Sequence, residues 1–355
     1  MKRQQWLDIA KGIAILTVVI GHVSIIPWEP YRKIIFSFHM PLFFIAAGYT
    51  AKAEISWKSI KKSAKRLMAP YILSCLIMGA VGIFEGNSFG SQLMRILWGN
   101  GVPADYGPGV PMKGWEGITA VGAIWFLPCM FFSRLFFCAV LTATKTLNEY
   151  MRATIILILC ICGYWIGQRY KLPMCVDVAL FNLVFLYAGY LFRNRDGINK
   201  KCVSLGVVLL LLWNAALKRN GLELSARFYR EFPMCIFTTV GAIAACFLIF
   251  YVSNEVLCKV KYIESLLSWC GKNSLAILLI HHFDGIIWES SWFTTWLPDT
   301  SSLPTATQGF IIGGCQIMIY LIVCMVYVLA KKQWKQLLAK RLRSVQPKGF
   351  VNDQK

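Results

Sequence analysis

Ten largely apolar stretches follow one another along this 355-residue chain, and they constrain its fold more than any other feature. A helix needs about 20 consecutive apolar residues to cross the hydrocarbon core of a bilayer. The pattern therefore predicts an all-α polytopic membrane protein with about ten transmembrane helices in one bundle. The stretches lie near residues 7–27, 34–52, 67–85, 118–142, 153–170, 175–192, 202–217, 233–253, 266–283 and 307–330.

The composition excludes a soluble domain. Hydrophobic residues make up 57% of the chain and charged residues 15%, whereas soluble domains average about 45–50% and about 25%. Such hydrophobicity also excludes a disordered chain. The net charge of +20 would indicate a nucleic-acid partner in a soluble protein, but in a membrane protein it is typical of basic cytoplasmic loops. We expect contact with membrane lipid and no nucleic-acid partner.

The Lys and Arg residues are unevenly divided between the two sides of the predicted bundle. With the N-terminus inside, the inner segments hold 24 of the 37, the outer segments hold 10, and three lie within spans. Cytoplasmic loops carry the excess of positive charge, so we expect both termini in the cytoplasm. Residues 1–335 are expected to form one integral-membrane domain and residues 336–355 a basic cytoplasmic tail. The first span contains Asp8 and Lys11 and no small-residue cleavage site follows it, so we expect it to stay in the membrane.

The 13 cysteines do not indicate a metal or redox site. Most lie inside apolar stretches, and no pair has the C-x-x-C spacing of zinc or dithiol motifs. Buried cysteine behaves as a small hydrophobe, so we expect helix packing and no bound metal. No internal repeat is evident, which weakens a transporter hypothesis because many transporters are built from repeats.

Ionisable residues inside a span are costly and therefore indicate function. Asp8 and Lys11 are three residues apart in the first span, so they face the same way and can form a pair. His22 follows Lys11 by eleven residues, which is about 1100° of rotation and a rise of about 16 Å. Lys11 and His22 therefore lie on one stripe at opposite depths, and we expect that stripe to face the interior of the bundle.

All four histidines fall in or beside the outer half of the predicted membrane domain. His22 and His39 each lie about five residues from the outer end of their spans, and His281 and His282 end the ninth span on the same side. We interpret them as a shared site, since histidine is the commonest general acid and base. On the inner side, the basic run that ends at Arg66 is suited to the phosphate groups of a cytoplasmic donor.

Five motifs, taken together and in order, resemble those of the integral-membrane acyltransferase family 3, which includes fucose 4-O-acetylase-like proteins. They are Lys11 and His22 in the first span, the run Phe38 to Phe44, the segment Lys65-Arg66 to Pro70-Tyr71, the run Trp125-Phe126-Leu127, and Gly271 to Ser274 followed by His281. The family often has arginine where this chain has Lys11. Lysine keeps the charge but lacks the planar guanidinium fork.

The resemblance implies a membrane O-acyltransferase, in the first place an O-acetyltransferase, in the bacterial cytoplasmic membrane. Its co-substrate would be acetyl-CoA or another acyl-CoA from the cytoplasm, and its acceptor a hydroxyl of a cell-surface or lipid-linked carbohydrate. No permanently bound cofactor is implied. The implied roles are catalysis for His22 and His39, donor binding for Lys11 and Arg66, and acceptor binding or support for Asp8, Trp125, Ser274 and His281.

Two other classes of protein fit the same residues. A transporter or flippase for a lipid-linked sugar would also need buried charge and outer polar groups. A signalling or scaffold protein would tolerate the loss of both His22 and His39. The residues leave open the acceptor sugar, the choice between acetyl and succinyl or other acyl groups, a covalent acyl-histidine step and the oligomeric state.

Overall fold

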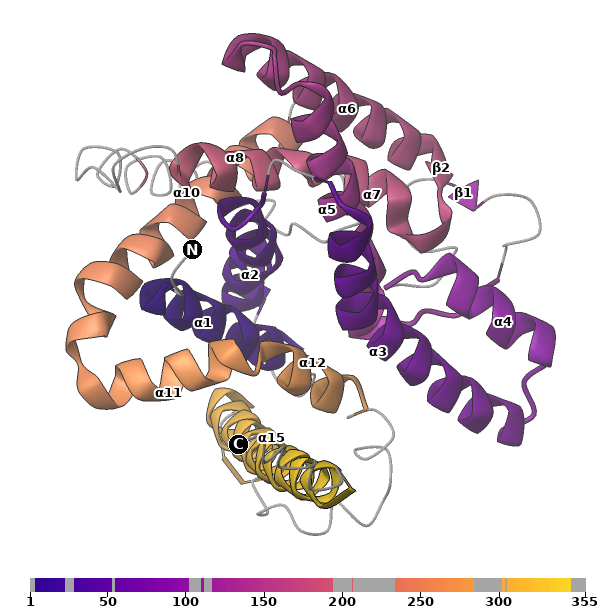
Figure 1. Ribbon diagram of the computed structural model, residues 1–355, viewed down its shortest axis with the longest axis vertical. Coiled ribbons are helices and arrows are strands. Elements are labelled where there is room, and N and C mark those ends of the chain that lie inside the picture. The colour runs from indigo at the N-terminus through magenta and orange to yellow at the C-terminus, as the bar shows by residue number, and fades with distance from the viewer. Residues whose placement is uncertain are drawn as a thin grey trace, which may run out of the picture.

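The computed structural model is a bundle of helices of very different lengths (Figure 1). It describes residues 4–22, 29–52, 55–101, 110–111, 117–193, 206, 234–283, 302–303 and 305–345. Within this part, the only sheet is a parallel pair of two-residue strands, with Val110 opposite Tyr170. The prediction of an α-helical membrane protein is confirmed.

The helices, 3-10 helices and strands follow the expected stretches closely. In chain order they are α1 (Gln5–Gly21), α2 (Glu29–Tyr49), α3 (Trp57–Phe84), α4 (Phe89–Trp98), β1 (Val110–Pro111), η1 (Gly122–Trp125), α5 (Phe126–Ala143), α6 (Glu149–Arg169), β2 (Tyr170–Lys171), η2 (Pro173–Cys175), α7 (Val176–Phe181), α8 (Leu183–Arg193), α10 (Met234–Glu255), η3 (Leu257–Lys259), α11 (Lys261–Lys272), α12 (Ser274–His282) and α15 (Thr305–Val345).

Among the described residues, five helices are long and apolar enough to cross a membrane, and the number rises to seven if each of two bent helix pairs is one span. The bent pairs are η2 and α7 with α8, and α11 with α12. The seventh expected span, 202–217, lies outside the described residues except for Gly206. The total of about ten spans therefore stays a prediction.

Both bent pairs break at an asparagine. The angle between the two segments is 47° at Asn182 and 66° at Asn273. The Asn273 side chain donates to the Trp269 carbonyl oxygen at 2.9 Å, which gives that carbonyl a partner at the end of α11. Each break divides one apolar stretch into two shorter helices, so one expected span can approach two different neighbours.

Helix α1 is held at the centre of one group of helices by glycine contacts with α11. A Cβ atom on Gly12 would overlap the Leu267 carbonyl oxygen, and one on Gly271 would overlap the Asp8 carbonyl oxygen. Small residues let helix backbones approach closely in membranes, and here both sides of the contact depend on them. Helices α2 and α8 meet in the same way, through Gly48 and Gly189.

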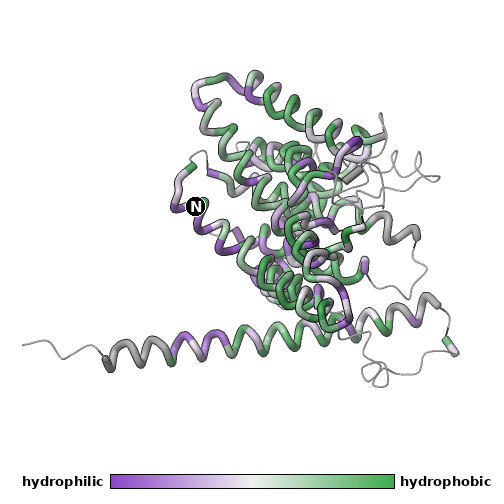
Figure 2. Tube along the Cα trace, turned by 90° about the vertical axis from the view of Figure 1, so that its right-hand side faces the viewer, coloured by the Kyte–Doolittle hydropathy of each residue, from purple (hydrophilic) through white to green (hydrophobic). Residues whose placement is uncertain are grey.

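Helix α15 is much longer than a bilayer requires. Its 41 residues correspond to about 61 Å, against a hydrocarbon core of about 30 Å. Figure 2 shows that the hydrophilic part of this long helix lies on the side of the molecule where the chain begins, and the sequence of that part includes Lys331, Lys332 and Lys335. The start of α1 and this part of α15 therefore lie on the same side of the bundle. The expected domain boundary after residue 335 falls inside α15.

Candidate active site

The N-terminal part of α1 holds an ion pair with a buried carboxylate. The Lys11 ammonium lies 2.7 Å from the Asp8 carboxylate, and the Asp8 side chain is only 3% exposed. Gly271 of α11 packs directly against the Asp8 backbone, so the pair lies at the closest contact between the two helices. The predicted pairing of Asp8 with Lys11 is confirmed.

His22 and His39 are held in the same ring orientation by their own helices. Each Nδ1 donates to the carbonyl oxygen four residues earlier: His22 to Val18 and His39 to Ile35, both at 2.7 Å. A carbonyl oxygen can only accept, so the proton of each neutral ring must be on Nδ1. The basic lone pair is therefore on Nε2 in both residues, as a general base requires.

Three histidines, at the end of α1, in α2 and in α12, form a chain of ring contacts. The Phe36 ring lies 5.4 Å from the His22 ring and 4.9 Å from the His39 ring, between centroids. The His281 ring lies 5.1 Å from that of His22. The structure therefore brings together His22, His39 and His281, as their positions in the sequence predicted. His39 and His281 are buried, whereas His22 is exposed and lies at the end of α1.

The C-terminal end of α12 adds the fourth histidine, His282. A Cβ atom on Gly122, the first residue of η1, would lie 3.6 Å from His282 Nδ1. Two buried ring nitrogens, His281 Nδ1 and His282 Nε2, have no hydrogen-bond partner among the described residues. Buried polar atoms are nearly always paired, so these two nitrogens mark where a polar ligand would bind. Tyr320 of α15 contacts the His281 ring at 5.8 Å and closes the cluster from another side.

Two of the expected supporting residues have local structural roles. Trp125 ends η1 and is half-buried, and its ring fills the space that a Cβ atom on Gly101 would occupy. Its ring also contacts Phe126, at 6.3 Å. Ser274 is the first residue of α12, immediately after the 66° break at Asn273. The structure thus places Trp125 beside the histidine cluster and Ser274 at the other end of α12.

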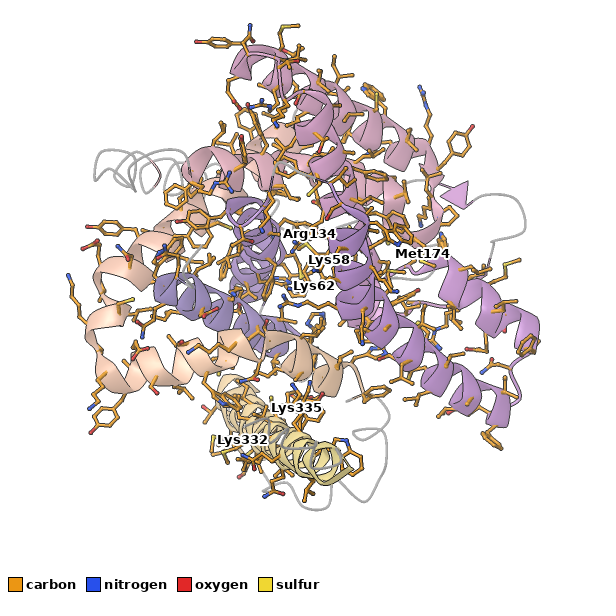
Figure 3. The ribbon with its side chains drawn as sticks, viewed as in Figure 1. Lys58, Lys62, Arg134, Met174, Lys332 and Lys335 are labelled. Carbon is orange, nitrogen blue, oxygen red and sulfur yellow. The ribbon has the colours of Figure 1, made fainter. Side chains whose placement is uncertain are left out.

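A separate basic cluster lies between α3 and α5. Lys58, Lys62 and Arg66 follow at intervals of four along α3 and so share one face. Arg134 of α5 is half-buried and close enough to Arg66 for the two charges to interact. Figure 3 shows Lys58, Lys62 and Arg134 near the centre of the view, between α3, α5 and the pair α1 and α2. None of the four side chains forms an ion pair with a described carboxylate.

Arg134 is the residue that the sequence interpretation missed. It was counted among the three basic residues inside spans and was given no role. A charge near the centre of a membrane helix costs about 3 kcal/mol on insertion scales, and a single arginine in the run Phe131 to Cys138 was a signal of function. In the structure, Arg134 interacts with another cation, Arg66, and forms no ion pair with a described acid.

Lys11 and Arg66 belong to different parts of the bundle. Helix α1 packs mainly against α11 and α2, whereas α3 packs against α5 and α4. The two predicted donor-binding cations therefore do not form one contact cluster. They lie on helices that face each other across the centre of the molecule (Figure 1).

A family model of an acyltransferase domain, that of acyltransferase family 3, matches residues 4–338. The chain belongs to this family. The match includes every residue of both clusters. Together with its apolar helices, membership of the family indicates a multi-pass membrane protein.

Curated relatives resemble only a part of this family member. The nodulation protein NolL of Mesorhizobium japonicum is 36% identical over 84 residues, which is 20% of this chain and 22% of that protein. NolL of Sinorhizobium fredii is 34% identical over 84 residues, 20% of this chain and 23% of that protein. The chain thus matches about a quarter or less of the length of each relative. No solved structure matches it at a significant level.

Proposed function

We propose that this acyltransferase is an O-acetyltransferase that moves an acetyl group from cytoplasmic acetyl-CoA to a hydroxyl of a cell-surface or lipid-linked carbohydrate. It acts in the bacterial cytoplasmic membrane, with about ten spans and both termini in the cytoplasm. The observation that carries this proposal is the tautomer of the His22 ring, whose Nδ1 donates to the Val18 carbonyl oxygen at 2.7 Å. That bond leaves Nε2 as the proton acceptor within the histidine cluster.

His22 acts as the general base. Its Nε2 takes the proton of the acceptor hydroxyl while the hydroxyl oxygen forms a bond to the thioester carbonyl carbon. The tetrahedral intermediate then collapses, the carbon–sulfur bond breaks, and the thiolate of CoA takes the proton back from the imidazolium. The products are the carbohydrate ester and CoA, and His22 returns to its starting state. General base catalysis of this kind contributes about 10²–10⁴-fold.

The other histidines hold the reactants. His39 is fixed by the Ile35 carbonyl oxygen and contacts the same Phe36 ring as His22. It orients the acceptor or stabilises the developing oxyanion. His281 contacts His22 directly, and its Nδ1 has no described partner. A hydroxyl of the acceptor would supply that partner and would place the sugar beside His22.

The basic cluster binds the donor. Four cations without a described carboxylate, Lys58, Lys62, Arg66 and Arg134, form a site suited to the phosphates of CoA. Lys11 serves the part of the donor that reaches toward α1, and its pairing with Asp8 fixes the position of its ammonium group. The donor thus enters from the lysine-rich side, and its thioester reaches the histidines at the end of α1 and in the middle of α2.

A transfer assay tests the proposal. Purified protein in detergent receives radiolabelled acetyl-CoA with and without a carbohydrate extract of the cell surface. We expect the label to move to carbohydrate and free CoA to appear only when acceptor is present. A transporter or flippase for a lipid-linked sugar would move labelled sugar across a vesicle membrane without releasing CoA, and that result would overturn the proposal.

The topology has its own test. A single cysteine that replaces Ser344, near the end of α15, is expected to react with an impermeant thiol reagent only after the cells are opened. A cysteine-free background is needed because the chain has 13 cysteines. Labelling in intact cells would refute a cytoplasmic C-terminus and with it the ten-span topology.

A further inference from the structure

A further cation, Arg95, lies on the proposed outer side. It is close to the histidines but belongs neither to the histidine cluster nor to the basic cluster. Arg95 of α4 is half-buried, and its Nε donates to the Ala120 carbonyl oxygen at 2.7 Å. The segment that contains Ala120 leads directly into η1, whose Gly122 contacts His282. Arg95 is therefore anchored to the chain segment that lies against the outer end of the histidine cluster.

The described residues around Arg95 are polar or aromatic, and none of those that interact with it is an acid. Its electrostatic neighbours are Tyr71, Cys75 and His282, and none of these carries a negative charge at neutral pH. Its other hydrogen bond goes to the neutral Gln92 side chain, at 3.4 Å. Burial lowers the pKa of the Arg95 guanidinium from its ordinary value. Arginine nevertheless stays charged in proteins, so this cation lacks the anion that a buried charge needs.

Only part of the guanidinium is used by the protein. Five N–H groups are available in a fixed fork, and the described contacts occupy one on Nε and one on Nη1. The remaining donors suit the bidentate binding of a carboxylate or phosphate. Two buried histidine nitrogens without described partners, on His281 and His282, lie on the same side of the molecule. They would bind the hydroxyl groups of the same ligand.

We propose that the acceptor carries a carboxylate or a phosphate on the acylated sugar or on its immediate neighbour, and that Arg95 binds this group. The inference rests on the proposed transfer to a carbohydrate. The sugar hydroxyls contact His281 and His282, the reacting hydroxyl reaches His22, and the anionic group extends toward α4. Arg95 is then a specificity residue that selects acidic or phosphorylated glycans over neutral ones.

The experiment has two steps. Mass spectrometry of surface glycans and glycolipids from cells with and without the gene identifies the species that loses an acyl group. We expect a carboxylate or a phosphate on the acylated sugar or the next one, and fragment masses distinguish the two. A neutral acceptor would overturn the role of Arg95 while leaving acyl transfer intact. If no glycan changes, acyl transfer to a surface carbohydrate is itself refuted, and this inference with it.

The second step uses the identified acceptor and its neutralised form, either esterified or dephosphorylated. The wild type is expected to show at least a tenfold higher KM for the neutralised acceptor. Arg95→Gln should lose this preference, Arg95→Lys should keep part of it, and the KM for acetyl-CoA should not change. Arg169→Gln is the control, since Arg169 is an exposed cation at the end of α6 that stacks on Trp165. An Arg95→Gln enzyme that keeps the full preference would show that Arg95 only anchors the Ala120 segment.

Discussion

His22→Gln separates the chemical role of the ring from its structural role. The native ring makes one described hydrogen bond, 2.7 Å to the Val18 carbonyl oxygen, and the residue is exposed. Loss of one such bond costs about 1 kcal/mol, so the protein should stay folded at normal abundance in the membrane. Loss of the general base should cost about 10²–10⁴ in rate, which is about 2.7–5.5 kcal/mol of transition-state stabilisation. Glutamine can still donate a hydrogen bond but cannot take up a proton.

The assay is transfer of radiolabelled acetyl groups to acceptor, with the thermal unfolding of the same purified samples as the stability measurement. Thr17→Val is the matched control, because Thr17 also bonds to α1 carbonyl oxygens and contacts none of the histidines. The control should keep nearly full activity. A His22→Gln enzyme within about threefold of the wild-type rate would contradict the 10²–10⁴-fold expectation. The base would then have to be His39 or His281.

Three further substitutions test other parts of the site. Lys11→Arg should keep transfer activity, whereas Lys11→Ala should lose it. Lys11→Ala should also lower stability by about 3 kcal/mol, measured by thermal unfolding, because the buried Asp8 carboxylate loses its Lys11 counter-ion. Gly271→Ala should lower the free energy of unfolding by about 1–3 kcal/mol or more, because the added methyl group forces α1 and α11 apart. Gly314→Ala on α15 is the control and should leave stability unchanged, because its added methyl group meets nothing within 4 Å. Arg134→Gln should raise the KM for acetyl-CoA about tenfold, which corresponds to about 1.4 kcal/mol, and should leave the KM for the acceptor unchanged. Lys332→Gln is the control and should leave both KM values unchanged.

The histidine cluster could be predicted from sequence because helix geometry is rigid. A residue five positions from the end of a span has a fixed depth, so His22, His39 and His281 could be assigned to one layer before any packing was known. The rotation of a helix about its axis was constrained for α1 alone, by the pair Lys11 and His22. Their grouping was therefore predictable, whereas the contacts through Phe36 were not.

The helix breaks at Asn182 and Asn273, in contrast, could not be predicted from the sequence. A hydropathy window averages over about 19 residues, so one asparagine in an apolar run changes the average very little. The backbone, however, bends by 47° and 66° at these points. In the sequence, Asn182 is only a polar residue within the expected span 175–192, and Asn273 is only part of the motif Gly271 to Ser274. Where a helix breaks depends on which neighbours satisfy the carbonyl groups at the break, and those neighbours come from distant parts of the chain.

The arrangement of the two clusters follows from how the helices divide. The proposed base is on α1, and its partners are on α2 and α12, whereas the cations without a described carboxylate are on α3 and α5. In the proposed reaction, the donor would bridge the two groups of helices. Such a donor needs a long, narrow arm between its charged end and its thioester. CoA has this form: its phosphates would bind at the basic cluster, and its pantetheine arm would extend to the histidines. Contacts to the phosphates would then contribute binding energy that holds the thioester carbonyl beside the acceptor hydroxyl. Binding far from the reacting atoms accelerates a bimolecular reaction in this way.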